Sequence, residues 1–169
     1  NLTSLILPNK ESGDLYLCRY FLSHTGVKQI YLPACTKIND GGAFCYAENL
    51  ENIVVDPMHP TMFSHDGMLC ELRDGIGVLV AFPVNWMYTD IQAERRDPVV
   101  SVPNGITILG TSAFAENKTV ETVYVPQSVT RFEFGAFKEA NTQAIQSLKN
   151  IYIYTNGPDI KTSAPTDLE

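Results

Sequence analysis

The sequence lacks long apolar runs and is poor in basic residues. No stretch approaches the roughly 18 consecutive apolar residues that a membrane-spanning helix needs, so we expect no membrane insertion in this segment. The 169-residue chain has 12 lysines and arginines against 19 aspartates and glutamates, a formal net charge of −7. A negative surface repels phosphate backbones and anionic lipid head groups. Nucleic acid is therefore not expected as a partner.

Signatures of catalysis and cofactor binding are also missing. The sequence contains no phosphate-binding loop, no dinucleotide-binding fingerprint and no nucleophile elbow. Four potential metal ligands do lie near one another in the sequence, namely His59, His65, Asp66 and Glu71. No helical histidine spacing unites them, and Asp66 already belongs to an Asp-Gly turn signal. We expect no metal, no cofactor and no enzyme activity; an enzyme with two carboxylates distant in the chain is a remote alternative.

Cysteine is scarce, and its spacing fits no metal site. The four cysteines, Cys18, Cys35, Cys45 and Cys70, do not match the spacing of paired zinc ligands. An even count permits two disulfides, but a chain of this length does not need them. We expect buried or half-buried free thiols, because a free cysteine behaves as a small core hydrophobe.

No signal peptide is visible at the start. Residues 2–7 already alternate like a strand, and we expect the segment to follow a removed signal peptide or an upstream repeat.

The sequence does contain an internal repeat. The dipeptide Ala-Phe recurs at Ala43-Phe44, Ala113-Phe114 and Ala136-Phe137. Apolar residues follow the first two phenylalanines after six and nine residues, and they follow Phe21 in the same way, with Tyr20 in the alanine position. After Phe137 the pattern is met five residues late, at Leu148 and Ile151, which predicts a five-residue insertion. Phe21 to Phe44 and Phe114 to Phe137 are both 23 residues, so we take about 23 residues as the unit.

Each unit begins with an alternating strand pattern with one buried face. A proline closes most of these patterns, at Pro8, Pro33, Pro103 and Pro126, a place where its missing N–H costs no ladder hydrogen bond. One unit offers only about five inward side chains, and their burial, at roughly 1.5–3 kcal/mol each, does not offset the ordering of its backbone. Stacked units share each buried layer, which predicts a solenoid. A β-sandwich with accidental spacing is the alternative.

Residues 56–97 depart from the unit. Three strand patterns lie at residues 62–65, 68–72 and 78–82, separated by the hairpin signals Asp66-Gly67 and Asp74-Gly75. We therefore predict a three-stranded β-meander. The predicted organisation is one domain over residues 1–155, with repeat blocks at 1–55 and 98–155 around the insertion at 56–97. Residues 156–169 are predicted to form a polar tail or linker.

Residues 102–137, VPNGITILGTSAFAENKTVETVYVPQSVTRFEFGAF, resemble the BspA-type leucine-rich repeats. Residues 56–83, with their Phe-Ser-x-Asp-Gly-x-Leu core and closing proline, are similar to the hairpin insertion that these proteins often carry. The resemblance covers roughly residues 1–155. It implies a β-rich leucine-rich-repeat solenoid with right-handed coils and a parallel sheet on one face. It also implies an extracellular or cell-surface protein that binds a protein or host-surface ligand. One departure is Asp56, which stands where other units close with proline.

Two columns of outward-facing residues are expected on the sheet, because side chains alternate along a strand. The first column contains Ser4, Gln29, Asn52, Val99, Thr122 and Asn150, and the second contains Ile6, Tyr31, Val54, Ser101, Tyr124 and Tyr152. Together they predict one stripe across the sheet, in which our candidate binding residues are Gln29, Tyr31, Asn52, Val54, Thr122, Tyr124, Asn150 and Tyr152.

Tyrosine is a common binding hot spot, although its high β propensity is an alternative explanation for the stripe. Trp86, Met87 and Tyr88 offer a second candidate surface, for which a partly buried rim is the alternative. We therefore predict an adhesion or protein-binding module, with a structural spacer that has no ligand of its own as the alternative.

Overall fold

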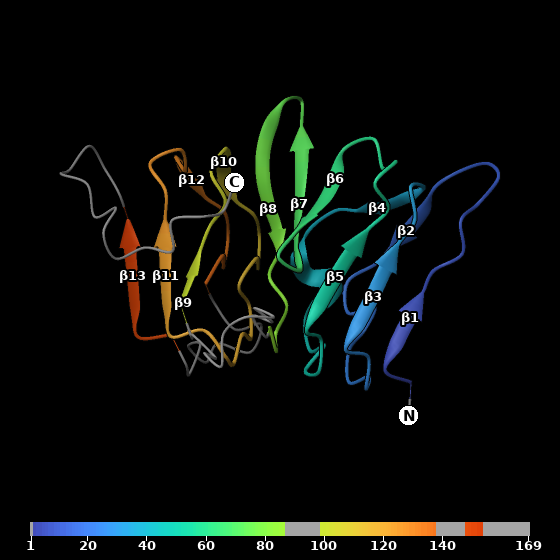
Figure 1. Cartoon of the computed structure of the whole chain (residues 1–169), viewed down its shortest axis with the longest axis horizontal. Helices are drawn as coiled ribbons and strands as arrows, with labels where there is room; N and C mark the ends of the chain where they lie inside the picture. Colours follow the sequence, from blue (N-terminus) through green and yellow to red (C-terminus); the bar gives the residue numbers. More distant parts are fainter. Residues whose placement is uncertain (1, 87–98, 138–147, 154–169) are drawn as a thin grey trace, which may run out of the picture.

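The computed structural model describes residues 2–86, 99–137 and 148–153, and this part of the chain is built almost entirely of strands (Figure 1). The strands are β1 Ser4–Ile6, β2 Leu15–Leu17, β3 Gln29–Leu32, β4 Thr36–Ile38, β5 Asn52–Val55, β6 Met62–His65, β7 Met68–Arg73, β8 Ile76–Ala81, β9 Val99–Ser101, β10 Ile106–Leu109, β11 Thr122–Val125, β12 Arg131–Phe132 and β13 Asn150–Ile153, with a short 3-10 helix, η1, at Gly41–Phe44. In the described residues, no helix is long and apolar enough to cross a membrane.

Within the described residues, each coil before β13 contributes a first strand to one side of the molecule and a second strand to the other. The first strands form two parallel sheets, ordered β1-β3-β5 and β13-β11-β9. On the other side, β2 pairs with β4, and β12, β10 and β8 pair in parallel. The predicted leucine-rich-repeat solenoid with a parallel sheet on one face is therefore confirmed, and the opposite side carries more strand than the sequence indicated.

The register of the first strands follows the predicted period. Ile30 pairs with Ile53, and Val100 pairs with Val123, both 23 residues apart. Val123 pairs with Ile151, 28 residues on, so the expected five-residue insertion is present, although residues 138–147 lie outside the described part. Ile30, Ile53 and Val123 are fully buried. The alternation predicted for the first strands is confirmed in β3, β5, β9 and β11, whereas all four residues of β13 are exposed.

The phenylalanine that follows alanine at the corner of a coil, which we call the ring position, stacks on its equivalent in the next coil. Phe114 lies between Phe82 and Phe137. Its ring centroid is 4.8 Å from that of Phe82 and 5.0 Å from that of Phe137. Ala81-Phe82, at the end of β8, is thus a further Ala-Phe corner that the sequence analysis missed, because the insertion displaces it from the 23-residue spacing.

The ring position of the first coil was wrongly assigned to Phe21. The backbone N–H groups of Tyr20 and His24 donate to the carbonyls of Gly42 and Tyr46 in the next coil. Positive φ angles at Tyr20 and His24 flank Leu22 just as those at Ser112 and Glu116 flank Phe114. Leu22, which is 2% exposed, therefore takes the ring position, whereas Phe21 falls in the alanine position and is 39% exposed. The loop between Leu22 and the next strand is one residue shorter than in the following coil, which made the offsets from Phe21 look regular.

The insertion is the predicted three-stranded meander, with β6 and β7 antiparallel and β7 and β8 antiparallel. Both residues of each Asp-Gly turn have positive φ angles, as a two-residue hairpin turn of type I′ requires. β8 then pairs in parallel with β10, so it also serves as the second strand of its own coil. A Cβ atom on Gly77 of β8 would lie 2.3 Å from the Gly105 carbonyl oxygen, so this close approach between the strands requires glycine.

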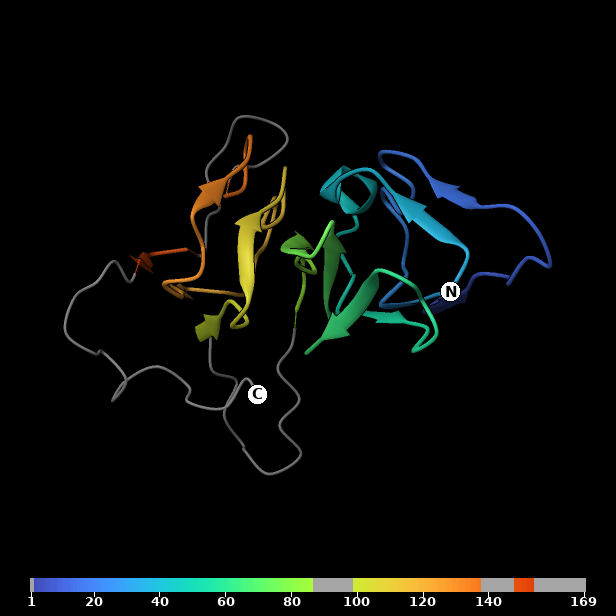
Figure 2. The ribbon, with the colours of Figure 1, turned by 90° about the horizontal axis from the view of Figure 1, so that it is seen from above.

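The meander separates two hydrophobic cores. Met62, Leu69 and Val78 belong to the core of the first coils, whereas Cys70 and Leu79 belong to the core of the last coils. Figure 2 shows the green meander strands between the blue coils and the yellow and orange coils. Since β7 and β8 bury side chains on both faces, the insertion is an internal wall and not an appendage.

Candidate binding face

The two predicted columns exist, and strand pairing places their members side by side. In the first sheet Ser4, Gln29 and Asn52 are register partners, as are Ile6, Tyr31 and Val54. In the second sheet Val99, Thr122 and Asn150 are partners, as are Ser101, Tyr124 and Tyr152. All twelve side chains are half-buried or exposed, and in β3, β5, β9 and β11 they alternate with buried residues. We call these twelve residues the outer face.

The outer face is not the single stripe that the sequence predicted. The Asp66-Gly67 turn lies at the free edge of β5, where the Gly67 carbonyl accepts a hydrogen bond from the Ile53 N–H. The Trp86 indole N–H donates to the Asp66 carbonyl at 2.7 Å and anchors this turn. The turn occupies the edge at which β9 would continue the sheet, so the face is divided into two halves of three strands each.

The first half combines an amide pair with a tyrosine beside a carboxylate. The Asn52 amide donates to the Gln29 amide oxygen at 3.3 Å. Desolvation raises the pKa of Tyr31, and a hydrogen bond to Asp56 and the charge of that carboxylate raise it further. Asp56 was not among the candidate residues. Its position in place of the closing proline was the signal that could have identified it.

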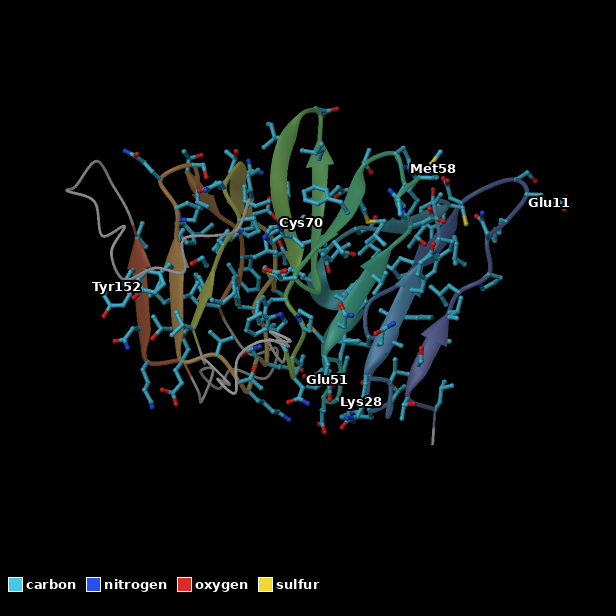
Figure 3. The ribbon with its side chains drawn as sticks, viewed as in Figure 1. Glu11, Lys28, Glu51, Met58, Cys70 and Tyr152 are labelled. Atoms are coloured by element: carbon cyan, nitrogen blue, oxygen red, sulfur yellow. The ribbon has the colours of Figure 1, made fainter. Side chains whose placement is uncertain are left out.

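The second half is dominated by a tyrosine pair. The Tyr124 and Tyr152 rings stack with centroids 5.1 Å apart and planes inclined by 16°. In the neighbouring column the Asn150 amide donates to the Thr122 hydroxyl at 3.3 Å. Tyr152 is 42% exposed, and Figure 3 shows it at the side of the molecule formed by β13. The stacking of the rings follows directly from the strand spacing, because register partners in adjacent strands are about 4.8 Å apart.

Ion pairs border the outer face without entering it. The Lys28 ammonium lies 2.8 Å from the Glu51 carboxylate, at the start of β3 and β5 (Figure 3). The Lys149 ammonium lies 2.8 Å from the Glu121 carboxylate, at the start of β13 and β11. Each pair joins register neighbours, so these charges neutralise each other locally.

Of the second candidate surface, only Trp86 lies within the described residues, and it is buried. Trp86 is only 6% exposed, and its ring packs 5.2 Å from that of Phe82. Trp86 therefore belongs to the core of the last coils and is not an exposed binding residue. Met87 and Tyr88 lie outside the described residues, as do residues 91–98 and the predicted tail at 156–169.

The residues considered as metal ligands have separate structural roles. His59 is buried and bonded to backbone, His65 lies 3.8 Å from Asp66, and Glu71 pairs with Arg73. Within the part of the chain that the structure describes, no three histidine, cysteine or acidic side chains are grouped so that they could hold a metal ion.

All four cysteines are free thiols. Cys45 and Cys70 are buried and Cys35 is half-buried, as expected, but Cys18 is exposed, because it follows β2 at the outer edge of the β2-β4 sheet. Burial raises the pKa of the Cys70 thiol to about 12. Burial, together with the charge of Glu116, raises the pKa of Cys45 to about 11.

Comparison with known proteins agrees with this architecture. Residues 98–164 match the family described as "BspA type Leucine rich repeat region (6 copies)". No curated protein sequence matches the chain.

Three solved structures share the fold. The chain is similar to a leucine-rich cell surface protein from Faecalibacterium prausnitzii, with 19% identity, a TM-score of 0.62, and coverage of 90% of this chain and 41% of that one. A leucine-rich repeat protein from Eubacterium ventriosum matches with 17% identity, a TM-score of 0.62 and coverage of 92% and 43%. The pneumococcal vaccine antigen PcpA matches with 15% identity, a TM-score of 0.56 and coverage of 75% and 28%. The chain thus spans about two fifths of the length of the first two proteins.

Proposed function

We propose that this chain is a binding module at the cell surface that recognises its partner with the outer face; the match of residues 98–164 to the BspA-type leucine-rich-repeat family supports the proposal. The observation that carries the proposal is the register of the first strands, which brings the eight candidate residues together as four in each half of the outer face, where they are half-buried or exposed. Repeat proteins commonly place their function on such extended surfaces. The description of the Faecalibacterium prausnitzii neighbour as a cell surface protein supports the proposed location.

The candidate contact residues are those of the two halves, Gln29, Tyr31, Asn52, Val54, Thr122, Tyr124, Asn150 and Tyr152. Tyrosine provides a large contact area with two rotatable side-chain bonds and one hydroxyl group, so it loses little entropy on binding. The proposal is one of binding and not of catalysis, and it requires no metal or cofactor.

The test is a binding screen of the wild-type chain against immobilised extracellular-matrix proteins and an oligosaccharide array. Replacing Tyr31, Tyr124 and Tyr152 together by alanine is expected to weaken the binding found in the screen by about a hundredfold, which corresponds to about 2.7 kcal/mol. Circular dichroism checks that the variant is folded. Binding that survives the triple change would refute the outer face as the site, and an absence of any ligand would favour the structural spacer.

A further inference from the structure

Asn104 and Gly105 form the tip of the turn that leads from β9 into β10. The Ile106 N–H donates to the Pro103 carbonyl at 3.2 Å, and Gly105 has a φ angle of 86°. This is the pattern of a type II turn, whose third residue needs a positive φ angle. Both tip residues are exposed. The turn therefore presents an Asn-Gly pair at the surface.

The surroundings of this pair leave its reactive atoms free. An asparagine side chain is attacked by the backbone nitrogen of the following residue, and glycine shields that nitrogen least because it has no side chain. Within the described residues, neither the Asn104 amide nor the Gly105 N–H takes part in a hydrogen bond. A Cβ atom on Gly105 would meet no heavy atom within 4 Å, so nothing packs against the tip.

The other asparagines in the described part of the chain differ from Asn104. None of them precedes a glycine. Asn9 is the closest counterpart, because it is exposed and also follows the closing proline of a first strand, but it precedes Lys10. Four further asparagines have side-chain amides that donate hydrogen bonds, namely Asn49, Asn52, Asn117 and Asn150.

We propose that Asn104 is a site of covalent self-modification, at which the side chain loses ammonia and the residue becomes isoaspartate. A base removes the proton of the Gly105 N–H, and the nitrogen forms a bond to Cγ of Asn104. The bond between Cγ and Nδ2 breaks, and Nδ2 takes up a proton and leaves as ammonia. One water molecule then opens the resulting succinimide at either carbonyl, which gives aspartate or isoaspartate without any oxidation or reduction.

Ring closure requires the turn to open. A type II turn holds its second residue at a ψ angle of about +120°, which directs the Gly105 nitrogen away from the Asn104 side chain. Exposed segments with few contacts open locally at a free energy far below that of global unfolding. The turn therefore sets the rate of the reaction, while the rest of the solenoid stays folded.

The isoaspartyl product is expected to prevent the turn from closing again. Its chain runs through Cγ, so the backbone between residue 104 and Gly105 is one atom longer. The Gly105 carbonyl oxygen lies so close to β8 that a Cβ atom on Gly77 would approach it to 2.3 Å. Ile106, which follows directly, is 2% exposed in the core of the last coils. The added atom therefore has no space, and β10 loses its close contact with β8.

The first test is incubation of the wild-type chain at physiological temperature, followed by mass spectrometry with electron-transfer fragmentation, which distinguishes isoaspartate from aspartate. Of the asparagines in the described residues, Asn104 is expected to be converted first, with Asn9 as the matched internal control. The rate is expected to rise with pH, because the attacking nitrogen must lose its proton. Conversion at this position should be lost in Asn104→Gln, since attack on the longer side chain forms a larger ring less readily.

The second test measures the structural effect. The isoaspartyl form, isolated by ion exchange, is compared in thermal unfolding with Asn104→Asp, which carries the same charge on a backbone of normal length. The midpoint of the isoaspartyl form is expected to be the lower of the two.

Three outcomes would overturn the inference. An unmodified Asn104, or conversion of Asn9 as fast as that of Asn104, would remove the modification site. Equal midpoints of the isoaspartyl form and Asn104→Asp would refute the proposed loss of contact between β8 and β10.

Discussion

At the scale of single residues, His59 shows how one buried polar side chain joins two coils. Its Nδ1 atom accepts hydrogen bonds from the backbone N–H groups of Met62 at 2.8 Å and Thr61 at 3.2 Å. Nε2 must then carry the hydrogen, and it donates to the Thr36 carbonyl at 2.9 Å. The neutral ring thereby ties the start of the meander to β4 of the preceding coil.

Replacing His59 by alanine is expected to lower the free energy of unfolding by about 2–3 kcal/mol, because two N–H groups and a carbonyl lose their partner in a site where water has little access. Urea denaturation measures the change. Met58→Ala is the matched control, since Met58 lies in the same turn and is 81% exposed. A loss below about 0.5 kcal/mol for His59→Ala, the level expected of surface changes, would mean that the ring does not hold the turn.

The cysteine thiols are expected to differ in reactivity, because each has its own degree of burial and its own pKa. A thiolate reacts and a thiol does not, and burial raises the pKa of Cys70 to about 12 and that of Cys45 to about 11. At about pH 8 both remain protonated and covered in the folded chain, whereas Cys18 is exposed.

Iodoacetamide at about pH 8, followed by mass spectrometry, is therefore expected to label Cys18 first in the folded chain and to leave Cys45 and Cys70 unmodified. In urea all four cysteines should react. Raising the pH moves Cys45 toward its pKa before Cys70, so Cys45 should be the first of the two to gain label. Early labelling of Cys70 would show that the meander opens in the native state.

At the scale of structural elements, the phenylalanine stack connects the corners of consecutive coils. Phe114 is 1% exposed and has an aromatic neighbour on each side, Phe82 from the coil before and Phe137 from the coil after. Each coil therefore depends on the presence of the next for the burial of its ring, which is the property that makes a repeat array cooperative.

Phe114→Ala is expected to destabilise the fold by about 3–5 kcal/mol, because it leaves a cavity between two rings. Phe134→Ala serves as the control for the loss of a phenylalanine in the same block, since Phe134 is 81% exposed. Thermal and urea unfolding measure both. Similar effects of the two changes would contradict the stack as a stabilising feature.

At the scale of the whole molecule, β8 connects the first coils with the last coils. It pairs with β7 on one edge and with β10 on the other, and its residues enter both hydrophobic cores. β1, by contrast, is the terminal strand of its sheet, and its inward residue Leu5 is only partly buried, whereas its partner Ile30 is fully buried.

Native-state hydrogen exchange should reflect this difference. The amides of β8 are expected to exchange only on global unfolding, at a free energy in the range of about 5–15 kcal/mol, and those of β1 through local opening at a much lower value. Mass spectrometry with fragment resolution distinguishes the two. If β8 exchanged as readily as β1, the two cores would be opening independently at the meander.

Much of this fold could be predicted from the sequence because its determinants are local and repeated. The alternation that buries Ile30, Ile53 and Val123 depends only on the geometry of a strand, and the two Asp-Gly turns depend only on the φ angles of two residues. The 23-residue period and the five-residue insertion before β13 both follow from counting, and together they placed the candidate binding residues in columns.

Contacts between residues distant in the sequence decided the rest. Leu22 and not Phe21 is buried in the first coil, where the positive φ angles at Tyr20 and His24 shift the corner by one residue relative to the local offsets. Trp86 is buried, and its indole N–H donates to the carbonyl of Asp66, which lies 20 residues away in the sequence. The Asp66-Gly67 turn lies at the edge of β5 and divides the outer face. The sequence by itself therefore determined which residues face outward, because side chains alternate along a strand. Only the tertiary structure decided which of these residues lie together, because contacts between distant residues set the borders of each sheet.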